Sequence, residues 1–523
     1  MTQMSVQDAL ALGMRHHSAG RLDQAESVYA QVLVAFPNHP YALHLLGVAA
    51  LDRGKHDEAI DLIRKAISIH PDDPHFYFNL GVAEAIRGRW EDAVAAYQQA
   101  VSIQPDYADA HNNLGGALLG LDRAAEAVLH YRTAVNLRPE SAVFENNLSS
   151  ALCRLGELEE AATHARRAGD LDPKLADSFV NLGSSLHLLG DISGAIEAYQ
   201  KAIALQPDHA NAHYSLGLTL IGNGDLAQGW AECEWRLRVP GRFKFEFSQP
   251  GWDGSSLKGK SILLWHEQGF GDTLQFVRYA PILADMGARV VLLVPPQLKR
   301  LMAQIPGVGV VISDGEAIPA CDFHCPLLSV PHRLGTDLSS IPSDVPYLHA
   351  DAGLVSGWRA RLGARGDVLN VGLVWAGQSR QGDDRNRSMQ LASLFPLASI
   401  GKARFISLQM GAASGQIGAM HNQWELVDLG SSIQDFADSA AIVSLLDLVI
   451  SVDSAPCHLA GGLGLPVWVL LPFVASWRWM RERTDSPWYP TARLFRQTVR
   501  GDWQTPVMQI ADALSERASQ VKR

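Results

Sequence analysis

Two segments in the second half of the chain carry residue types that could bind and transfer a phosphorylated group. The segment HEQGFGDTLQF contains His266, Glu267 and Asp272, each of which could serve as a general base or orient one. The segment AGQSRQGDDRNRSMQ places Arg385 and Arg387 close together, and forked guanidinium groups suit phosphate oxygens. We expect these arginines to bind and neutralise a diphosphate.

A third segment, DSAPCHLAGGLGLP, has the pattern of a helix start that binds an anion. We expect Asp453 and Ser454 to cap the helix and His458 to lie in its first turns. The N-terminus of a helix attracts negative charge, so this segment predicts the other half of a diphosphate site. In the first segment, Gly269 and Gly271 permit a tight turn and a close approach of the backbone.

Two further groups of residues are candidate ligand sites. Gln409 follows the apolar run RFISL and is a candidate to contact the nucleobase or ribose of a donor. The spacing of Cys321, His324 and Cys325 suggests zinc, but these residues lie on an apolar run with no second Cys/His pair nearby. We therefore expect no metal and no cofactor.

The elements that must position these segments are short apolar strands alternating with helices. Continuous apolar strands of this kind are typical of parallel sheets covered on both faces. The runs are 261–265, 289–294, 309–313, 369–375, 404–408, 447–452 and 466–471. They predict two Rossmann-like α/β domains, over 258–350 and 366–523, that face each other across a cleft at the carboxyl ends of their strands.

The first half of the chain is an internal repeat of 34 residues. Glycines, alanines and prolines recur at this period, and the prolines fall at Pro37, Pro71, Pro105, Pro139, Pro173 and Pro207. Prolines end the second helix of a hairpin, and turn glycines end the first, as at Gly54, Gly88, Gly156 and Gly190. The pattern resembles the tetratricopeptide repeat and predicts an all-α superhelix over 6–238, with six full repeats and a degenerate seventh, then a linker over 239–257. We expect the sheets and cleft of residues 240–523 to be complete without the repeats.

One polar position recurs with the repeat. An asparagine lies two residues before the repeat glycine, at Asn79, Asn113, Asn147 and Asn181. Stacked repeats would align these amides into a ladder that hydrogen-bonds an extended peptide. The repeats therefore predict an acceptor protein as partner.

Composition and charge exclude several classes of protein. The chain has 523 residues, of which 47% are hydrophobic and 19% charged, as in a globular protein. Residues 1–240 carry 18 basic and 30 acidic side chains, and the second half is nearly neutral, so neither half suits nucleic acid. The start of the chain lacks a secretion signal pattern, and the longest apolar run is interrupted by glycine and proline, so we expect a cytoplasmic protein without membrane spans.

The segments around Asp272 and His458 resemble the ADP-heptose lipopolysaccharide heptosyltransferases, although Ala455 and Pro456 stand where that family commonly has glycine after the Asp-Ser/Thr pair. That resemblance implies the two-domain GT-B fold, metal-independent glycosyl transfer, and a role for Asp272 in activating the acceptor. Repeats joined to such a domain are similar to bacterial flagellin glycosyltransferases, and the asparagine ladder resembles that of protein O-GlcNAc transferases.

These patterns together predict a glycosyltransferase that moves a sugar from a nucleotide-activated donor to a protein, flagellin being one such acceptor. Two alternatives remain at this level: a lipopolysaccharide-type sugar transferase, and a non-catalytic repeat scaffold with a decayed transferase domain. The donor nucleotide, its sugar, the stereochemical outcome, the natural acceptor and the oligomeric state are open. So is the choice of base among His266, Glu267 and Asp272.

Overall fold

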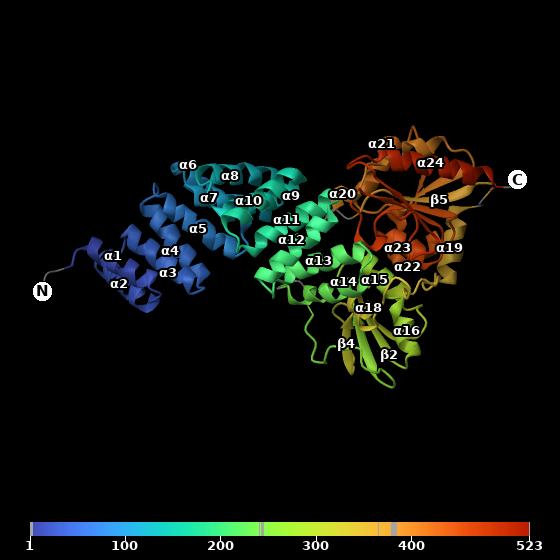
Figure 1. Cartoon of the computed structure of the whole chain (residues 1–523), viewed down its shortest axis with the longest axis horizontal. Coiled ribbons are helices and arrows are strands. Elements are labelled where there is room, and N and C mark those ends of the chain that lie inside the picture. The colour runs from blue at the N-terminus through green and yellow to red at the C-terminus, as the bar shows by residue number, and fades with distance from the viewer. Residues whose placement is uncertain (1–3, 240, 242–244, 364–365, 378–383, 522–523) are drawn as a thin grey trace. The chain divides into compact units, whose positions relative to one another are not determined.

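The computed structural model describes residues 4–239, 241, 245–363, 366–377 and 384–521. It divides into two compact units, Met1–His209 and Ala210–Arg523 (Figure 1). The first unit is all-α and the second contains two parallel sheets with helices. No helix among the described residues combines the length and apolar character needed to span a bilayer.

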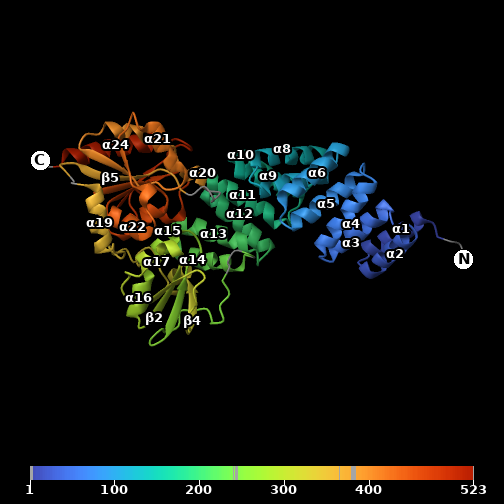
Figure 2. The ribbon, with the colours of Figure 1, turned by 180° about the vertical axis from the view of Figure 1, so that it is seen from behind.

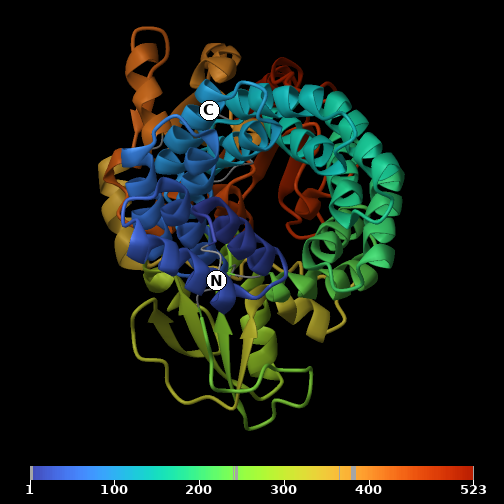
Figure 3. The same ribbon diagram turned by 90° about the vertical axis from the view of Figure 1, so that its left-hand side faces the viewer.

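The first unit is a stack of helical hairpins that wind about a common axis (Figure 3). Successive helices pack in sequence order, as expected for tetratricopeptide repeats. The helices are α1 Val6–Ser18, α2 Leu22–Ala35, α3 Pro40–Asp52, α4 His56–Ile69, α5 Pro74–Ile86, α6 Trp90–Ile103, α7 Ala108–Gly120, α8 Ala124–Leu137, α9 Ala142–Leu155, α10 Leu158–Leu171, α11 Ala176–Leu189 and α12 Ile192–Leu205.

The repeated small residues mark where the two helices of a hairpin touch. A Cβ added to Gly81 would lie 2.6 Å from a ring carbon of Tyr97, so a larger residue would push the helices apart. Gly115 and Gly183 meet the tyrosines of their own hairpins in the same way. The turn glycine Gly54 has φ +74°, a backbone conformation that favours glycine. The predicted repeat is therefore confirmed.

The degenerate seventh repeat packs with the α/β unit. Its helices are α13 Ala210–Gly222 and α14 Leu226–Cys233, followed by a 3-10 helix, η1, over Glu234–Arg238. Trp230 of α14 is 3% exposed and stands edge-on to Phe276 and Trp477. Its indole N–H donates to the carbonyl of Thr336 at 3.1 Å. This helix pair is thus part of the core of the second unit.

The first sheet has four parallel strands in the order β3-β2-β1-β4. The strands are β1 Ser261–Trp265, β2 Arg289–Val294, β3 Val308–Ser313 and β4 Phe323–Pro326. The first three match predicted strands, whereas β4 was not predicted. Helices cover one face, and Phe245 and Phe247 of the connecting segment pack against the other. That segment therefore supplies part of the core, where the sequence predicted a linker.

The second sheet has six parallel strands in the order β10-β9-β8-β5-β6-β7. They are β5 Leu369–Val374, β6 Ala403–Ser407, β7 Leu426–Asp428, β8 Leu448–Val452, β9 Val467–Leu471 and β10 Ala492–Arg496. Four match predictions; β7 and β10 were not predicted. Helices α22 Phe436–Val443 and α23 Ala455–Gly462 cover one face, and α24 Gln504–Ser519 covers the other (Figure 2).

The strand orders identify where a ligand would bind. Numbered from β5, the second sheet has the order 3-2-1-4-5-6 of dinucleotide-binding Rossmann folds, read from the opposite edge. The order reverses between β5 and β8, and in the first sheet it reverses between β1 and β4. In such sheets ligands bind beyond the carboxyl ends of the strands at the reversal.

The remaining helices connect and flank the strands. The α-helices are α15 Phe270–Phe276, α16 Tyr279–Asp285, α17 Pro296–Met302, α18 Val330–Arg333, α19 Ala352–Leu362, α20 Asp384–Arg387 and α21 Gln416–Met420. The 3-10 helices are η2 Leu327–Ser329, η3 Leu391–Ser399, η4 Ala412–Gly415, η5 Gly430–Ser432 and η6 Trp477–Trp479.

Candidate functional site

The loops after β1 and β8 meet at the start of their helices. Gly271, in the first turn of α15, faces His458 of α23: a Cβ at this glycine would lie 2.9 Å from the imidazole Cδ2 atom. A side chain here would separate the two helices, which explains this glycine. Gly269 precedes α15 with φ −72°, an ordinary value, so its backbone does not require glycine as the sequence had suggested.

Asp272, in the helix that follows β1, forms an ion pair with an arginine from the loop that follows β9 of the second sheet. One carboxylate oxygen accepts a hydrogen bond from the backbone N–H of Gly269 at 3.1 Å, and the other forms an ion pair with Arg478. Arg478 belongs to η6, which follows β9. Arg478 was not among the predicted site residues, because it lies between two tryptophans and 206 residues from Asp272 in sequence. Its place in the segment that follows the carboxyl end of β9, which also contains Arg481 and Arg483, was the available signal.

His458 is a buried, neutral imidazole. It is 3% exposed and stacks on Trp479 with ring centroids 5.4 Å apart. Its Nδ1 atom shares a hydrogen bond with the Tyr489 hydroxyl at 2.9 Å, and its Nε2 atom lies 3.8 Å from a carboxylate oxygen of Asp453. Burial, followed by the charge of Arg478, holds its pKa well below the usual value. The ring can therefore donate one hydrogen bond without carrying charge.

Asp453 directly follows β8 and is buried beside His458. Burial raises the pKa of the Asp453 carboxyl above its usual value, although the charges of Arg478 and Arg387 oppose the rise. Ser454 occupies the N-cap position of α23, but its hydroxyl donates to the carbonyl of Val452 at 3.2 Å, and no side-chain capping bond to the helix forms. The predicted cap is thus correct in position and wrong in its hydrogen bond.

The arginine segment is partly described. Arg387 ends α20, and its charge acts on both Asp453 and His458. The side chain of Arg385 lies outside the described residues.

The other two candidate bases have different surroundings. Glu267 is fully buried and binds Arg236 through both oxygens, at 2.8 and 2.9 Å, and one oxygen also accepts from the Leu328 N–H at 3.2 Å. Burial raises the pKa of Glu267 and the charge of Arg236 opposes the rise. A carboxylate held this way fixes the loop, which corrects the expectation that it acts as a base. His266 pairs with Asp314 at 2.9 Å.

Gln409 does not have the contacts expected of a nucleotide-binding residue. Its carbonyl oxygen accepts from the N–H groups of Trp375 and Ala376 at 3.0 and 2.9 Å. Its amide nitrogen donates to the carbonyls of Ala376 and Met410, both at 3.0 Å. These four bonds use the capacity of a primary amide. Gln409 therefore fixes the turn after β5, and the expected contact with a nucleobase or ribose is not supported.

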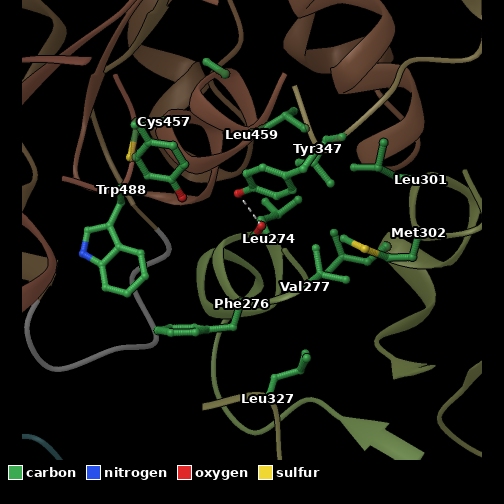
Figure 4. Close-up of a cluster of buried hydrophobic side chains, with 14 of the residues drawn as sticks. Leu274, Phe276, Val277, Leu301, Met302, Leu327, Tyr347, Cys457, Leu459 and Trp488 are labelled. Atoms are coloured by element: carbon green, nitrogen blue, oxygen red, sulfur yellow. Dashed lines mark hydrogen bonds between the residues drawn. The ribbon is translucent and has the colours of Figure 1, made fainter. Parts of the chain in front are cut away.

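Besides Arg236, a second arginine, Arg278, is buried in this unit. Arg278, 3% exposed, donates to the carbonyls of Gln275, Pro342 and Trp488 at 2.8, 2.9 and 2.7 Å. It also donates to the Tyr347 hydroxyl at 3.0 Å, which in turn donates to the carbonyl of Leu274 (Figure 4). It thus ties the start of the first sheet's helices to the loop before β10.

Three side chains of α23 and its preceding turn offer possible metal ligands. One ligand atom each from Asp453, Cys457 and His458 lies within 4.8 Å of the others. A cation there would meet the charges of Arg478 and Arg387, which already act on Asp453. The same charges suit an anion, so the cluster fits a phosphate better than a metal.

His324 accepts a hydrogen bond from the Trp265 indole at 3.2 Å, and Cys325 is buried in the sheet.

Three of the four ladder asparagines contact the preceding repeat within the first unit. Asn79 donates to His44 at 2.9 Å, Asn147 to Asn112 at 2.9 Å, and Asn181 to Asn146 at 2.8 Å. Each of these partners lies 35 residues earlier, so the amides link consecutive repeats. Asn113 instead accepts from Asn112. The carbonyl oxygens of Asn79, Asn147 and Asn181 make no hydrogen bond among the described residues.

Comparisons with known proteins identify the repeats. Models of the tetratricopeptide repeat match residues 10–74, 83–122, 108–141 and 183–224. Repeats of this class bind peptides or proteins. The protein FlbA of Caulobacter vibrioides is 25% identical over 324 residues, which cover 57% of this chain and 53% of that protein. The chain thus spans about half the length of this curated relative.

Two solved structures resemble part of the chain. The crystal structure of YrrB, a TPR protein with an unusual peptide-binding site, covers 35% of this chain and 95% of its own, with 21% identity and a TM-score of 0.32. MamA covers 31% of this chain and 96% of its own, with 26% identity and a TM-score of 0.29.

Proposed function

We propose that the chain is a glycosyltransferase that moves a sugar from a nucleotide-activated donor to a protein acceptor. The observation that carries the proposal is the meeting of Asp272, Arg478 and His458 where loops from both parallel sheets come together. These loops follow β1, β8 and β9, beside the points where the strand orders reverse. The layout agrees with the GT-B architecture that the sequence resembles.

The donor diphosphate would bind at the start of α23. The backbone N–H of Ala455 at the start of the helix, with Arg387, Arg478 and the His458 ring, would supply positive charge and donors. These groups stabilise the leaving nucleoside diphosphate without a metal. In the transfer, a bond forms between the acceptor oxygen and the anomeric carbon while the bond from that carbon to the phosphate breaks. Asp272 takes the hydroxyl proton.

The repeats would hold the acceptor. The unpaired amide oxygens of the asparagine ladder can accept hydrogen bonds from the N–H groups of an extended peptide. The excess of acidic side chains in the first 240 residues favours a basic segment. Because repeats and transferase share one chain, binding at the ladder raises the local concentration of acceptor.

The donor part of the proposal predicts a thermal shift. Among UDP, GDP, ADP and CMP, at least one is expected to raise the melting temperature of the full chain. A ligand at 100 times its Kd adds about 2.7 kcal/mol to the stability of the unit that binds it. His458→Ala should abolish that shift while Lys260→Gln, at a surface pair, should keep it. The absence of a shift with all four nucleotides would contradict the donor assignment.

A further inference from the structure

Arg478 contacts the predicted base, Asp272, directly. Its Nη2 atom pairs with Asp272, its Nε–H donates to the side-chain oxygen of Gln275 at 2.8 Å, and its Nη1 atom donates to the Ser476 hydroxyl at 2.9 Å. The guanidinium lies 4.3 Å from the centre of the Trp477 ring. This network fixes the guanidinium over Asp272.

In this arrangement Asp272 is blocked. One oxygen accepts from Gly269 and the other is paired with Arg478, and the two side chains are 12% and 14% exposed. A carboxylate with both oxygens occupied and its charge neutralised is a poor acceptor for the proton of an incoming hydroxyl. The acceptor could react only after the guanidinium moves.

The guanidinium also lies close to the place where the donor diphosphate would bind. Its partner Asp272 follows Gly271, which packs against His458 in the first turns of α23. Its charge also acts on Asp453, which directly follows β8. A diphosphate seated at that helix would offer several anionic oxygens to the same guanidinium. Asp272 and the donor would therefore compete for one cation.

We propose that Arg478 is a ligand of the donor diphosphate and that, without donor, the same guanidinium holds Asp272 inactive. The inference rests on the proposed function. When the diphosphate binds, Arg478 transfers its Nη2 contact from the carboxylate to phosphate oxygens, and Asp272 becomes free to take the proton of the acceptor. The base is thus available when donor is present, which sets an order of donor first and acceptor second.

The test is a double-mutant cycle on nucleotide binding by the full chain, measured by calorimetry with UDP, GDP, ADP and CMP. Asp272→Asn is expected to tighten binding about tenfold, because a charge-assisted contact that competes for Arg478 is lost. Arg478→Ala is expected to weaken binding roughly 10- to 100-fold. In the Arg478→Ala background, Asp272→Asn should then have no effect.

The cycle separates competition from simple repulsion. If Asp272 merely repels the diphosphate, Asp272→Asn will tighten binding equally with or without Arg478, and that result would overturn the inference. Arg478→Lys keeps the positive charge but lacks the paired N–H donors of the guanidinium group. It replaces Arg478→Ala in the cycle if the alanine variant does not fold. Arg483→Ala is the matched control, because that arginine pairs with Asp485 in an exposed part of the same segment. If the wild-type protein bound none of the nucleotides, the proposed function itself would fail, whereas normal binding without coupling would contradict the inference alone.

Discussion

Asp272→Asn is expected to reduce sugar transfer by about 10²- to 10⁴-fold, the usual contribution of a general base. The substitution keeps the size of the side chain and its acceptor oxygen for the Gly269 N–H, so the turn before α15 should persist. It removes the group that takes the proton of the acceptor. The measurement is the initial rate of transfer at saturating donor, together with the affinity for the nucleoside diphosphate, which should not weaken.

Asp485→Asn is the matched control, because it neutralises an exposed aspartate that also pairs with an arginine. It should transfer sugar at the wild-type rate. If Asp272→Asn also retained the wild-type rate, Asp272 would not be the base, and His266, which is paired with Asp314, would become the candidate.

The second large effect concerns where the second unit begins. A chain of residues 240–523 is expected not to fold, whereas residues 210–523 should fold cooperatively. The shorter chain lacks Arg236, which leaves Glu267 buried without its partner at a cost of about 3–5 kcal/mol. It also lacks Trp230, whose loss leaves a cavity worth about 3–5 kcal/mol. Together these costs approach the whole stability of a typical domain, about 5–15 kcal/mol.

Urea denaturation followed by circular dichroism distinguishes the two chains. Arg236→Gln in the longer chain tests the ion pair alone and should lower its stability markedly. Lys260→Gln removes one side of an exposed pair with Asp322 and should have little effect. A cooperative transition of normal midpoint for residues 240–523 would show that the seventh helix pair is dispensable, as the sequence had suggested.

Much of the fold could be predicted because its signals are periodic. The 34-residue spacing fixed the hairpins, since each turn glycine and helix-end proline has a local steric reason. The apolar runs predicted the central strands, which are buried on both faces. Strands β4 and β7 were not predicted because they have only four and three residues. Strand β10 was not predicted because arginines interrupt its apolar pattern at the sheet edge.

The site was predicted less completely because its contacts join distant segments. The loops around Asp272 and His458 have local turn signals, and the structure brings them together. The partner of Asp272, Arg478, is 206 residues away in sequence and carries no signal of its own pairing. Glu267 and Gln409 were misassigned for the same reason: their polar atoms are used by Arg236 and by the backbone after β5.

The most direct test of the account is transfer of a labelled sugar to protein. The full chain is incubated with labelled nucleotide sugars and a cell extract, and products are separated into protein and lipid. The same assay is run with a variant in which Asn79, Asn113, Asn147 and Asn181 are replaced by alanine, after its melting is checked because three of these amides link repeats. Donor hydrolysis reports whether the nucleotide site of this variant is intact.

We expect the wild-type chain to label protein, and the ladder variant to label it about tenfold less or lower, since three neutral hydrogen bonds at the unpaired amide oxygens are worth together roughly 1.5–4.5 kcal/mol. Donor hydrolysis should be equal in both. Equal labelling of protein by the two chains would remove the ladder from the account. Labelling confined to lipid, or no transfer from any nucleotide sugar, would contradict its central claim.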